Sequence, residues 1–384
     1  MKIAIVGPYF LPQLFGVEKV MLYHARYLAR RGHEVHVITS NRRFPTGRFD
    51  DVAEEEIYEE FTIHRIRVLL RSPSRLFYYL SNSGIVLGGL YALLTRISPD
   101  IVHVHNVASP AWAHTSARYT RSDGKKLFYS AHYHPDCLQL PHWHTALVHA
   151  LNRLPLSEAR RVFHLTAGDF HPFAREYPQA DRARFNVLPN GVLPPRDLHL
   201  RHMQPNHSSG SAALNILFVG RVEDHRKGFD LLEEVFARVR KPEWTLTVVG
   251  RVGDQKRSAL QSRFGSAVRV LGQLDESALE EAYAAADLFV MPSRYEGFGM
   301  PYIEAMRYSV PVIGTRVGGI PEVVPSGTGI LIDVDDMKGL SDAIVYLGSS
   351  EEIRSCMGEA GSEWSKRFHW DRIIEQLEAL YLSD

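Results

Sequence analysis

Short apolar runs rich in β-branched residues alternate with longer amphipathic stretches, and the whole alternation occurs twice along the chain. In the first half we expect strands at 2–6, 34–39, 101–105, 127–130 and 162–166, with an amphipathic helix at 17–31. In the second half we expect strands at 215–219, 245–249, 268–271, 288–291 and 312–314, with helices at 230–239, 277–285 and 301–308. Continuous apolar strands between helices are typical of parallel sheets covered on both faces. The pattern therefore predicts an α/β protein with two doubly wound, Rossmann-like domains.

The two halves are separated by a polar, irregular stretch from Val192 to Ala213, which contains Pro194-Pro195, Pro205 and a Ser-Gly-Ser run. Such composition is typical of a linker. We therefore predict a first domain over 1–191, a linker over 192–213 and a second domain over 214–364. Two doubly wound sheets joined in this way are expected to place a ligand-binding cleft between their carboxyl edges.

Composition narrows the class of protein. The 384 residues include 44 basic and 44 acidic side chains, so no net charge attracts nucleic acid and no nucleic-acid partner is expected. The apolar run at the N-terminus is too short for a secretory signal, and Ile85–Leu94 is about half of the ~20 residues that span a bilayer. The cysteines, Cys137 and Cys356, lie far apart and fit a reducing compartment. A cytoplasmic location is expected.

The most informative segment runs from Met291 to Met306 and carries two glutamates eight positions apart. Glu296 precedes a Gly-Phe-Gly turn, Pro301 is well placed to open a helix, and Glu304 falls in the first turns of that helix. Helix N-terminal amides that point outward form an anion site, here expected at Phe298, Gly299 and Met300. An anion site between two carboxylates that accept hydrogen bonds from hydroxyl groups suits a nucleotide sugar.

Two cations follow the strand expected at 215–219. Arg221 and Lys227 lie in the loop between this strand and the helix near Asp230. Together they are able to neutralise a diphosphate, although two solvated loop charges are the commoner meaning of such spacing on its own. The glutamate pair shifts the balance toward function. Gly16, between the first strand and helix, would let a phosphate approach the backbone, but a lone glycine is as often an ordinary turn.

Histidines gather after the strand expected at 127–130. We expect one of them to meet a ligand and disfavour a zinc site, because no cysteine supports one. The histidines in question are His132, His134, His142, His144 and His149. The acidic run Asp333-Val-Asp-Asp336 is interpreted as a solvated loop rather than a metal site.

Three arginines, Arg67, Arg71 and Arg75, recur at intervals of four residues among apolar and aromatic side chains. A solvated helical face is the commoner explanation of such a pattern. The alternative is a peripheral contact with anionic lipid at the inner face of the cell membrane.

At this point the chain resembles a retaining glycosyltransferase of the GT-B fold, family GT4, over nearly its whole length. Each matching motif is modest, and their ordered set is specific. The motifs are the Gly16 loop, Leu28–Val37, Pro99–His105, Leu188–Val192, Gly220-Arg221 with Lys227-Gly228, Glu296–Glu304 and Val317–Glu322. The segment from about Trp364 resembles the C-terminal helix that in this fold returns to the first domain, here expected over 365–384.

The resemblance implies roles for the matching residues. Arg221 and Lys227 would bind the donor diphosphate, Glu296 the hydroxyls of the transferred sugar, and Glu304 the ribose. His132 matches the family's histidine near the reacting phosphate and sugar. The Gly16 loop and the amides of Phe298, Gly299 and Met300 would assist at the diphosphate.

The reaction that the resemblance implies is a same-face displacement in which the leaving phosphate accepts the proton of the acceptor. It needs a nucleoside-diphosphate sugar as co-substrate and neither a cofactor nor a protein-bound metal. The acceptor would be a sugar, a glycolipid or a small aglycone chosen by the first domain, with His105 and His134 as candidate contacts.

Two departures from the family pattern stand out. Phe15 precedes Gly16 where a second glycine is common, and Tyr308-Ser309 replaces a small residue and a glycine. Three alternatives stay open: an oxidoreductase, disfavoured because the first loop lacks a Gly-x-Gly-x-x-Gly motif, a non-catalytic nucleotide-sugar scaffold, and an epimerase or phosphorylase of the same fold.

Overall fold

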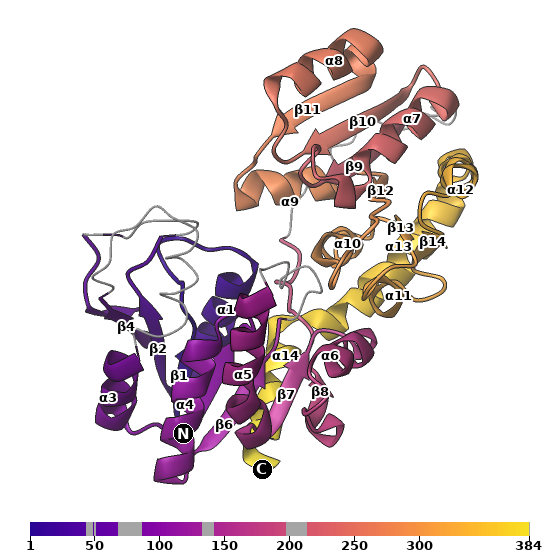
Figure 1. Cartoon of the computed structure of the whole chain (residues 1–384). Helices are drawn as coiled ribbons and strands as arrows, with labels where there is room; N and C mark the ends of the chain where they lie inside the picture. The colour runs from indigo at the N-terminus through magenta and orange to yellow at the C-terminus, as the bar shows by residue number, and fades with distance from the viewer. Residues whose placement is uncertain (44–48, 50, 68–86, 133–141, 197–212, 384) are drawn as a thin grey trace. The chain divides into compact units, whose positions relative to one another are not determined.

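The computed structural model describes residues 1–43, 49, 51–67, 87–132, 142–196 and 213–383 (Figure 1). The chain divides into two compact units. Unit 1 comprises Met1–Gly191 and Trp370–Asp384, and unit 2 comprises Val192–His369. No helix among the described residues is long and apolar enough to span a membrane.

Unit 1 is built on an eight-stranded sheet with the order β3-β4-β2-β1-β5-β6-β7-β8. Its strands are β1 (Lys2–Val6), β2 (Glu34–Ser40), β3 (Glu55–Tyr58), β4 (Phe61–Ile66), β5 (Ile101–His105), β6 (Lys126–Ser130), β7 (Arg161–His164) and β8 (Phe185–Val187). All neighbours pair in parallel except β3 and β4, so the expected parallel sheet has one antiparallel edge pair. The order reverses at β1, which places a topological switch point between β1 and β5.

Helices cover this sheet in two layers. One layer contains α3 (Leu87–Ile97), α4 (Pro110–Asp123) and α5 (His142–Glu158), which contact one another in sequence, and α6 (Phe170–Glu176) extends its apolar core. The other pairs α1 (Gly16–Arg30) with the C-terminal helix α14 (Trp370–Ser383). Because side chains alternate along a strand, Val102 and Val104 of β5 join the core of the first layer, whereas His103 contacts Tyr381 of α14.

Unit 2 is built on a six-stranded parallel sheet with the order β11-β10-β9-β12-β13-β14. Its strands are β9 (Leu214–Val219), β10 (Trp244–Val249), β11 (Val268–Gly272), β12 (Leu288–Val290), β13 (Val312–Thr315) and β14 (Gly329–Ile332). Its α-helices are α7 (Phe229–Val239), α8 (Asp254–Phe264), α9 (Glu276–Ala284), α10 (Met300–Met306), α11 (Ile320–Val323), α12 (Met337–Ser349) and α13 (Glu351–Ser365). The strand order reverses at β9, so the switch point of this sheet lies between β9 and β12.

The C-terminal return to unit 1 begins at Trp370, because residues 365–369 belong to unit 2. The Trp370 ring stacks on Tyr23 of α1 with 4.9 Å between ring centroids. It also lies against Gly191, where an added Cβ would be 2.3 Å from the indole. Of the expected linker, Val192 donates its amide to the Phe368 carbonyl at 2.7 Å, and residues 197–212 lie outside the described residues.

A buried ion pair in unit 2 generates a stability prediction. Glu280 of α9 and Arg307, directly after α10, are 2% and 8% exposed, and Arg307 Nη2 donates to Glu280 at 2.7 Å. We expect Arg307→Ala to lower the free energy of unfolding of unit 2 by about 1–3 kcal/mol, because the buried Glu280 carboxylate loses this hydrogen bond and keeps only its ion pair with Arg196, at 2.6 Å. Chemical denaturation followed by circular dichroism measures the loss.

The matched control for this prediction is the double variant Arg307→Met/Glu280→Leu. It removes both charges, so it is expected to recover much of the stability lost in Arg307→Ala. Equal destabilisation of the single and double variants would show that packing, and not the unpaired charge, determines the effect.

Candidate functional site

The candidate donor site lies at the switch point of the unit 2 sheet, where the loops after β9 and β12 leave neighbouring strands. The first loop carries Arg221 and Lys227, and the second carries Glu296. Carboxyl ends of parallel strands at a switch point are where ligands bind in such sheets. Both loops therefore deliver their charged side chains to the same edge.

The structure joins the two loops through one ion pair. Lys227 Nζ donates to Glu296 Oε2 at 2.5 Å, and the two side chains are 23% and 14% exposed. The pair brings together a cation able to bind phosphate and a carboxylate able to bind sugar hydroxyls, although 69 residues separate them in sequence. The structure thus brings into contact two residues that the sequence analysis assigned to one site.

Two glycines allow backbone segments around this pair to approach one another closely. Gly228 has φ +68°, and a Cβ there would lie 1.9 Å from the carbonyl oxygen of Pro292 in the second loop. Gly318 has φ +50°, and a Cβ there would lie 1.8 Å from the carbonyl oxygen of Glu296. No side chain fits at either position, and both have a left-handed backbone that favours glycine. Gly228 thus lets the first loop approach the second, and Gly318 lets the loop after β13 approach the backbone of Glu296.

Arg221 is the exposed cation of the site. Its side chain is 62% exposed, and its Nη2 donates to Asp224 at 2.7 Å. Asp224 also accepts two hydrogen bonds from the Arg226 guanidinium, at 2.9 and 2.8 Å, which lower the pKa of this carboxyl to about 2. Asp224 is therefore ionised at neutral pH and holds Arg221 in a contact that an incoming phosphate is able to replace.

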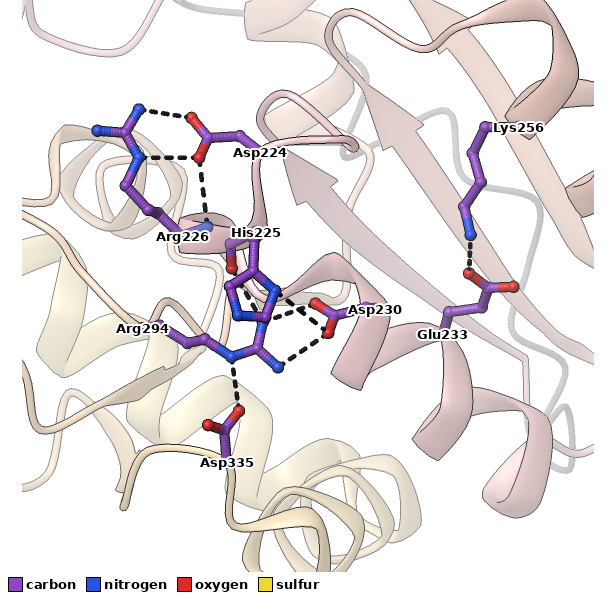
Figure 2. Close-up of polar contacts among 8 residues, drawn as sticks. All are labelled: Asp224, His225, Arg226, Asp230, Glu233, Lys256, Arg294 and Asp335. Carbon is purple, nitrogen blue, oxygen red and sulfur yellow. Dashed lines mark hydrogen bonds and ion pairs between the residues drawn. The ribbon is translucent and has the colours of Figure 1, made fainter.

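Arg294 links three segments around the site (Figure 2). Its two Nη atoms donate to Asp230 at the start of α7 at 2.7 and 2.9 Å, and its Nε donates to Asp335 after β14 at 2.7 Å. Nη1 also reaches the His225 carbonyl at 2.9 Å, and the backbone amide of Arg294 donates to the Arg226 carbonyl at 2.8 Å. Arg294 thus fixes the loop that carries Lys227 relative to the loop that carries Glu296.

The helix that follows supplies the rest of the site. Gly299 caps α10 with φ +90°, Pro301 stands in its first turn as expected, and Glu304 lies in its second turn. Within the described part of the chain, no hydrogen bond is donated by the amides of three consecutive residues, Phe298, Gly299 and Met300. Because α10 has only seven residues, these amides contribute more to an anion site than the helix dipole does.

Glu304 is held by a partner that the sequence analysis did not identify. The buried Tyr283 hydroxyl of α9 donates to Glu304 Oε2 at 2.8 Å. Burial raises the pKa of Tyr283 well above its ordinary value, so the hydroxyl remains a donor. Among the described residues no hydrogen bond or ion pair involves Glu304 Oε1, which leaves that oxygen able to accept from a hydroxyl group.

In unit 1, the loop between β1 and α1 ends at an exposed aromatic residue. Phe15 is 47% exposed, and its amide donates to Glu18 Oε2 at 3.1 Å. Gly16 opens α1, and a Cβ added there would contact nothing within 4 Å. Steric need therefore does not explain this glycine, and its predicted role at a phosphate stays a prediction.

Four histidines of unit 1 form a cluster between the sheet and the layer of α1 and α14. His132 follows β6 with a left-handed φ of +42°, a conformation that is strained for a non-glycine residue and is frequent at functional sites. Its Nε2 lies 2.9 Å from Nδ1 of His105, the last residue of β5. His103 and His24 complete the cluster, with ring centroids 4.4 and 5.3 Å from that of His105.

Burial determines the charge state of this cluster. It lowers the pKa of His132 to about 4 and that of His24 to about 3, and it holds the pKa values of His103 and His105 well below their ordinary value. The rings are therefore neutral at pH 7.

The other candidates of unit 1 have separate outcomes. His105 is fully buried and its Nδ1 contacts His132 Nε2, and its role as a contact for the acceptor stays a prediction. His134 lies outside the described residues, as do Arg71 and Arg75. His149 pairs with Glu176 at 2.7 Å, and the exposed Arg67 pairs with Glu54.

The acidic run after β14 has structural partners. Asp335 binds Arg294, and Asp336 caps α12 by accepting the Gly339 amide at 2.8 Å. Asp333 is exposed and lies 3.6 Å from Arg316. The run thus forms a loop after β14 and caps α12.

Comparison with known proteins places this geometry in a family. The family model for glycosyl transferases group 1 matches residues 213–350, and the model for glycosyltransferase family 4 matches residues 16–194. The chain belongs to these glycosyltransferases. The predicted family is therefore confirmed, and the enzyme transfers a glycosyl group.

Relatives and solved structures agree with this assignment. The glycosyltransferase is 29% identical to N-acetyl-alpha-D-glucosaminyl L-malate synthase of Bacillus anthracis over 98% of this chain and 96% of the relative. It is also 29% identical to a GDP-mannose-dependent alpha-mannosyltransferase of Mycolicibacterium smegmatis, over 90% and 88% of the two chains.

The fold resembles that of sucrose-phosphate synthase from Thermosynechococcus elongatus, with a TM-score of 0.78, 21% identity and coverage of 100% and 98%. It also resembles an Anabaena protein in complex with UDP, with a TM-score of 0.75, 17% identity and coverage of 100% for both chains. These similarities confirm two parallel-sheet α/β domains of the GT-B type.

Arg294, Tyr283 and His24 were not predicted as site residues of the glycosyltransferase. Arg294 lies inside the informative segment but resembles an ordinary surface arginine, because its partners come from distant loops. His103 and His105 had a usable signal, since residues two apart on a strand share a face. The position of His24 depends on how α1 packs, which no local pattern reveals.

The Arg294 contacts predict a kinetic effect. A lysine cannot make the forked contact with Asp230 and reach Asp335 and a carbonyl as well. We expect Arg294→Lys to lower kcat/KM for sugar transfer on the order of 10–100-fold through misplacement of Lys227 and Glu296, while the fold persists. Steady-state kinetics measures the loss. Arg316→Lys, in the exposed pair with Asp333, is the matched control and is expected to retain wild-type kinetics; an equal loss there would contradict this role.

Proposed function

We propose that this glycosyltransferase moves a hexose from a nucleoside-diphosphate sugar to a hydroxyl acceptor with retention of anomeric configuration. The observation that carries the proposal is the Lys227–Glu296 pair near three backbone amides that donate no hydrogen bond within the described part of the chain. This arrangement combines positive charge for a diphosphate with an acceptor for sugar hydroxyls. The relative named for GDP-mannose and the Anabaena protein bound to UDP favour a GDP- or UDP-linked hexose.

In the proposed donor complex, Arg221 and Lys227 bind the diphosphate oxygens, assisted by the amides of Phe298, Gly299 and Met300. Each donor is placed before the reaction begins, and such preorganised donors are usually the largest catalytic contribution. Glu296, released from part of its contact with Lys227, binds hydroxyls of the transferred hexose. Glu304 binds the ribose through Oε1 while Tyr283 holds Oε2.

The proposed reaction breaks the bond between the anomeric carbon and the leaving phosphate while the acceptor oxygen attacks the same face. The departing phosphate takes the acceptor proton, so no separate protein base is required. Arg221, Lys227 and the amides stabilise the charge that develops on the leaving diphosphate, and no metal ion is assigned to this step. His132 contacts the reacting sugar and phosphate as a neutral ring.

Unit 1 is proposed to choose the acceptor. Its β1–α1 loop presents the exposed Phe15, and its neutral histidines carry no charge that would favour an anionic acceptor. A sugar, a glycolipid or a small aglycone with a free hydroxyl satisfies these conditions. The peripheral membrane contact considered from Arg67, Arg71 and Arg75 applies to the glycolipid case alone.

Donor binding is tested first by thermal unfolding with UDP, GDP, ADP, dTDP and NAD. A ligand that binds only the native state stabilises it by about 2.7 kcal/mol at a hundredfold excess over its dissociation constant. We expect UDP or GDP to raise Tm and Glu304→Ala to abolish the shift, because the ribose loses its acceptor. Glu281→Ala, an exposed carboxylate on the helix of Tyr283, is the control that keeps the shift. A shift with NAD alone would sink the proposal.

The stereochemistry is a separate prediction. Once a donor is identified, proton NMR of the first product formed is expected to show the anomeric configuration of the donor. Lys227→Ala should reduce transfer on the order of 100–1,000-fold without changing that configuration, as for the loss of one preorganised donor. A product with the opposite configuration would exclude same-face displacement and leave the donor assignment intact.

A further inference from the structure

The histidine cluster of unit 1 contains buried ring nitrogens that have no hydrogen-bond partner. His24, His103 and His105 are each at most 1% exposed. One ring nitrogen from each lies within 4.8 Å of the other two. His24 Nδ1 and His105 Nε2 are buried and have no hydrogen-bond partner. A buried polar atom without a hydrogen-bond partner destabilises the fold, so two in one cluster need an explanation.

We propose that His24, His103 and His105 bind a transition-metal ion of the Zn²⁺ type. Imidazole nitrogens are preferred ligands for Zn²⁺ and Co²⁺. A tetrahedral ion with bonds of about 2.0–2.1 Å needs nitrogens about 3.4 Å apart, so modest side-chain rotations close the present spacing. The ion satisfies both orphan nitrogens at once, which a change of tautomer in either ring does not.

The surroundings fit the outer shell of such a site. His103 Nδ1 lies 2.6 Å from the Tyr381 hydroxyl, and His105 Nδ1 lies 2.9 Å from His132 Nε2. Hydrogen bonds of this kind orient metal-binding histidines and fix their tautomers. Ligation of His103 through Nε2 replaces its present 2.8 Å contact with the Ser130 hydroxyl.

A small space for a solvent molecule lies beside His24, one of the three proposed ligands. A small cavity lined by His24, Ser130 and His132 has about 10 Å³ of solvent-accessible space. This volume is close to the minimum for one water molecule. Three protein nitrogens and one water complete a four-coordinate ion.

The proposed ion affects the transfer reaction only indirectly, by fixing the orientation and tautomer of His132. Ligation of His105 through Nε2 requires its proton to be on Nδ1, from where it donates to His132 Nε2. The ion therefore fixes the tautomer of His132, with the remaining proton on its Nδ1. It takes no part in bond formation, so the metal-free displacement proposed above and this site stand or fall separately.

The test uses untagged full-length protein stripped with a chelator and titrated with Co²⁺ and then Zn²⁺. We expect about one ion per chain, with the visible absorption bands of tetrahedral Co²⁺ that disappear when Zn²⁺ is added. His24→Phe and His105→Asn are each expected to weaken binding by more than about 100-fold, since even the loss of an outer-shell partner costs 10–100-fold. Tyr381→Phe is expected to cost about 10–100-fold.

Two controls distinguish this site from adventitious binding. His164→Phe replaces a buried histidine that packs on Phe170, Phe173 and Phe185 instead, and it is expected to keep the ion. The double variant His142→Gln/His144→Gln replaces two histidines of the other histidine-rich segment and is also expected to keep the ion. Circular dichroism of each variant confirms the fold, and Tyr381→Phe provides the test if His24→Phe does not fold. Absence of binding to the wild type, or its loss only in the His142/His144 variant, would overturn the proposal.

Discussion

The candidate donor site depends on the ion pair between Lys227 and Glu296. It connects the loops that leave β9 and β12, the two strands that flank the switch point of the sheet. Without a ligand, each charge compensates the other in a partly buried position, where an uncompensated charge would be costly. In the proposed donor complex, the diphosphate would bind the lysine and the sugar hydroxyls would bind the carboxylate, so that two new contacts replace this one. Binding of the two ends of the proposed donor would then be coupled.

Two arginines near this pair differ in how firmly their side chains are held. Arg221 is largely exposed and has one acidic contact, so it is free to reorient toward a phosphate. Arg294 is 17% exposed and has contacts with Asp230, Asp335 and a carbonyl, which hold it in place. Figure 2 shows this fixed arginine between the segments that it joins. The site therefore combines a firmly held arginine with a largely exposed one. This combination suits a ligand that enters the site before all of its contacts have formed.

The sequence predicted the parts of the fold that depend on local pattern. The strands β1, β5, β9 and β12 were expected within one residue of their ends, because their apolar runs are continuous. The strand β4 was missed, since buried His64 and Arg65 interrupt its apolar pattern, and Arg65 is compensated by Glu56 at 2.8 Å. Likewise, the sequence separation of Lys227 and Glu296 does not reveal how far apart they lie in space. They meet because β9 and β12 are neighbours in the sheet.

The two units use the same architecture for chemically different edges. In each, the strand order reverses at the first strand. In unit 2 the residues of interest follow β9 and β12, whereas in unit 1 they lie on α1, on β5 and directly after β6. In unit 2 these residues are charged and paired, as binding of an anionic diphosphate requires. In unit 1 they are histidines that burial keeps neutral at pH 7, because a charged imidazole there would lose its hydration without gaining a carboxylate. This difference in charge fits the proposal that unit 2 binds the anionic donor and unit 1 an uncharged acceptor, because buried neutral rings add no charge to compete with the diphosphate site.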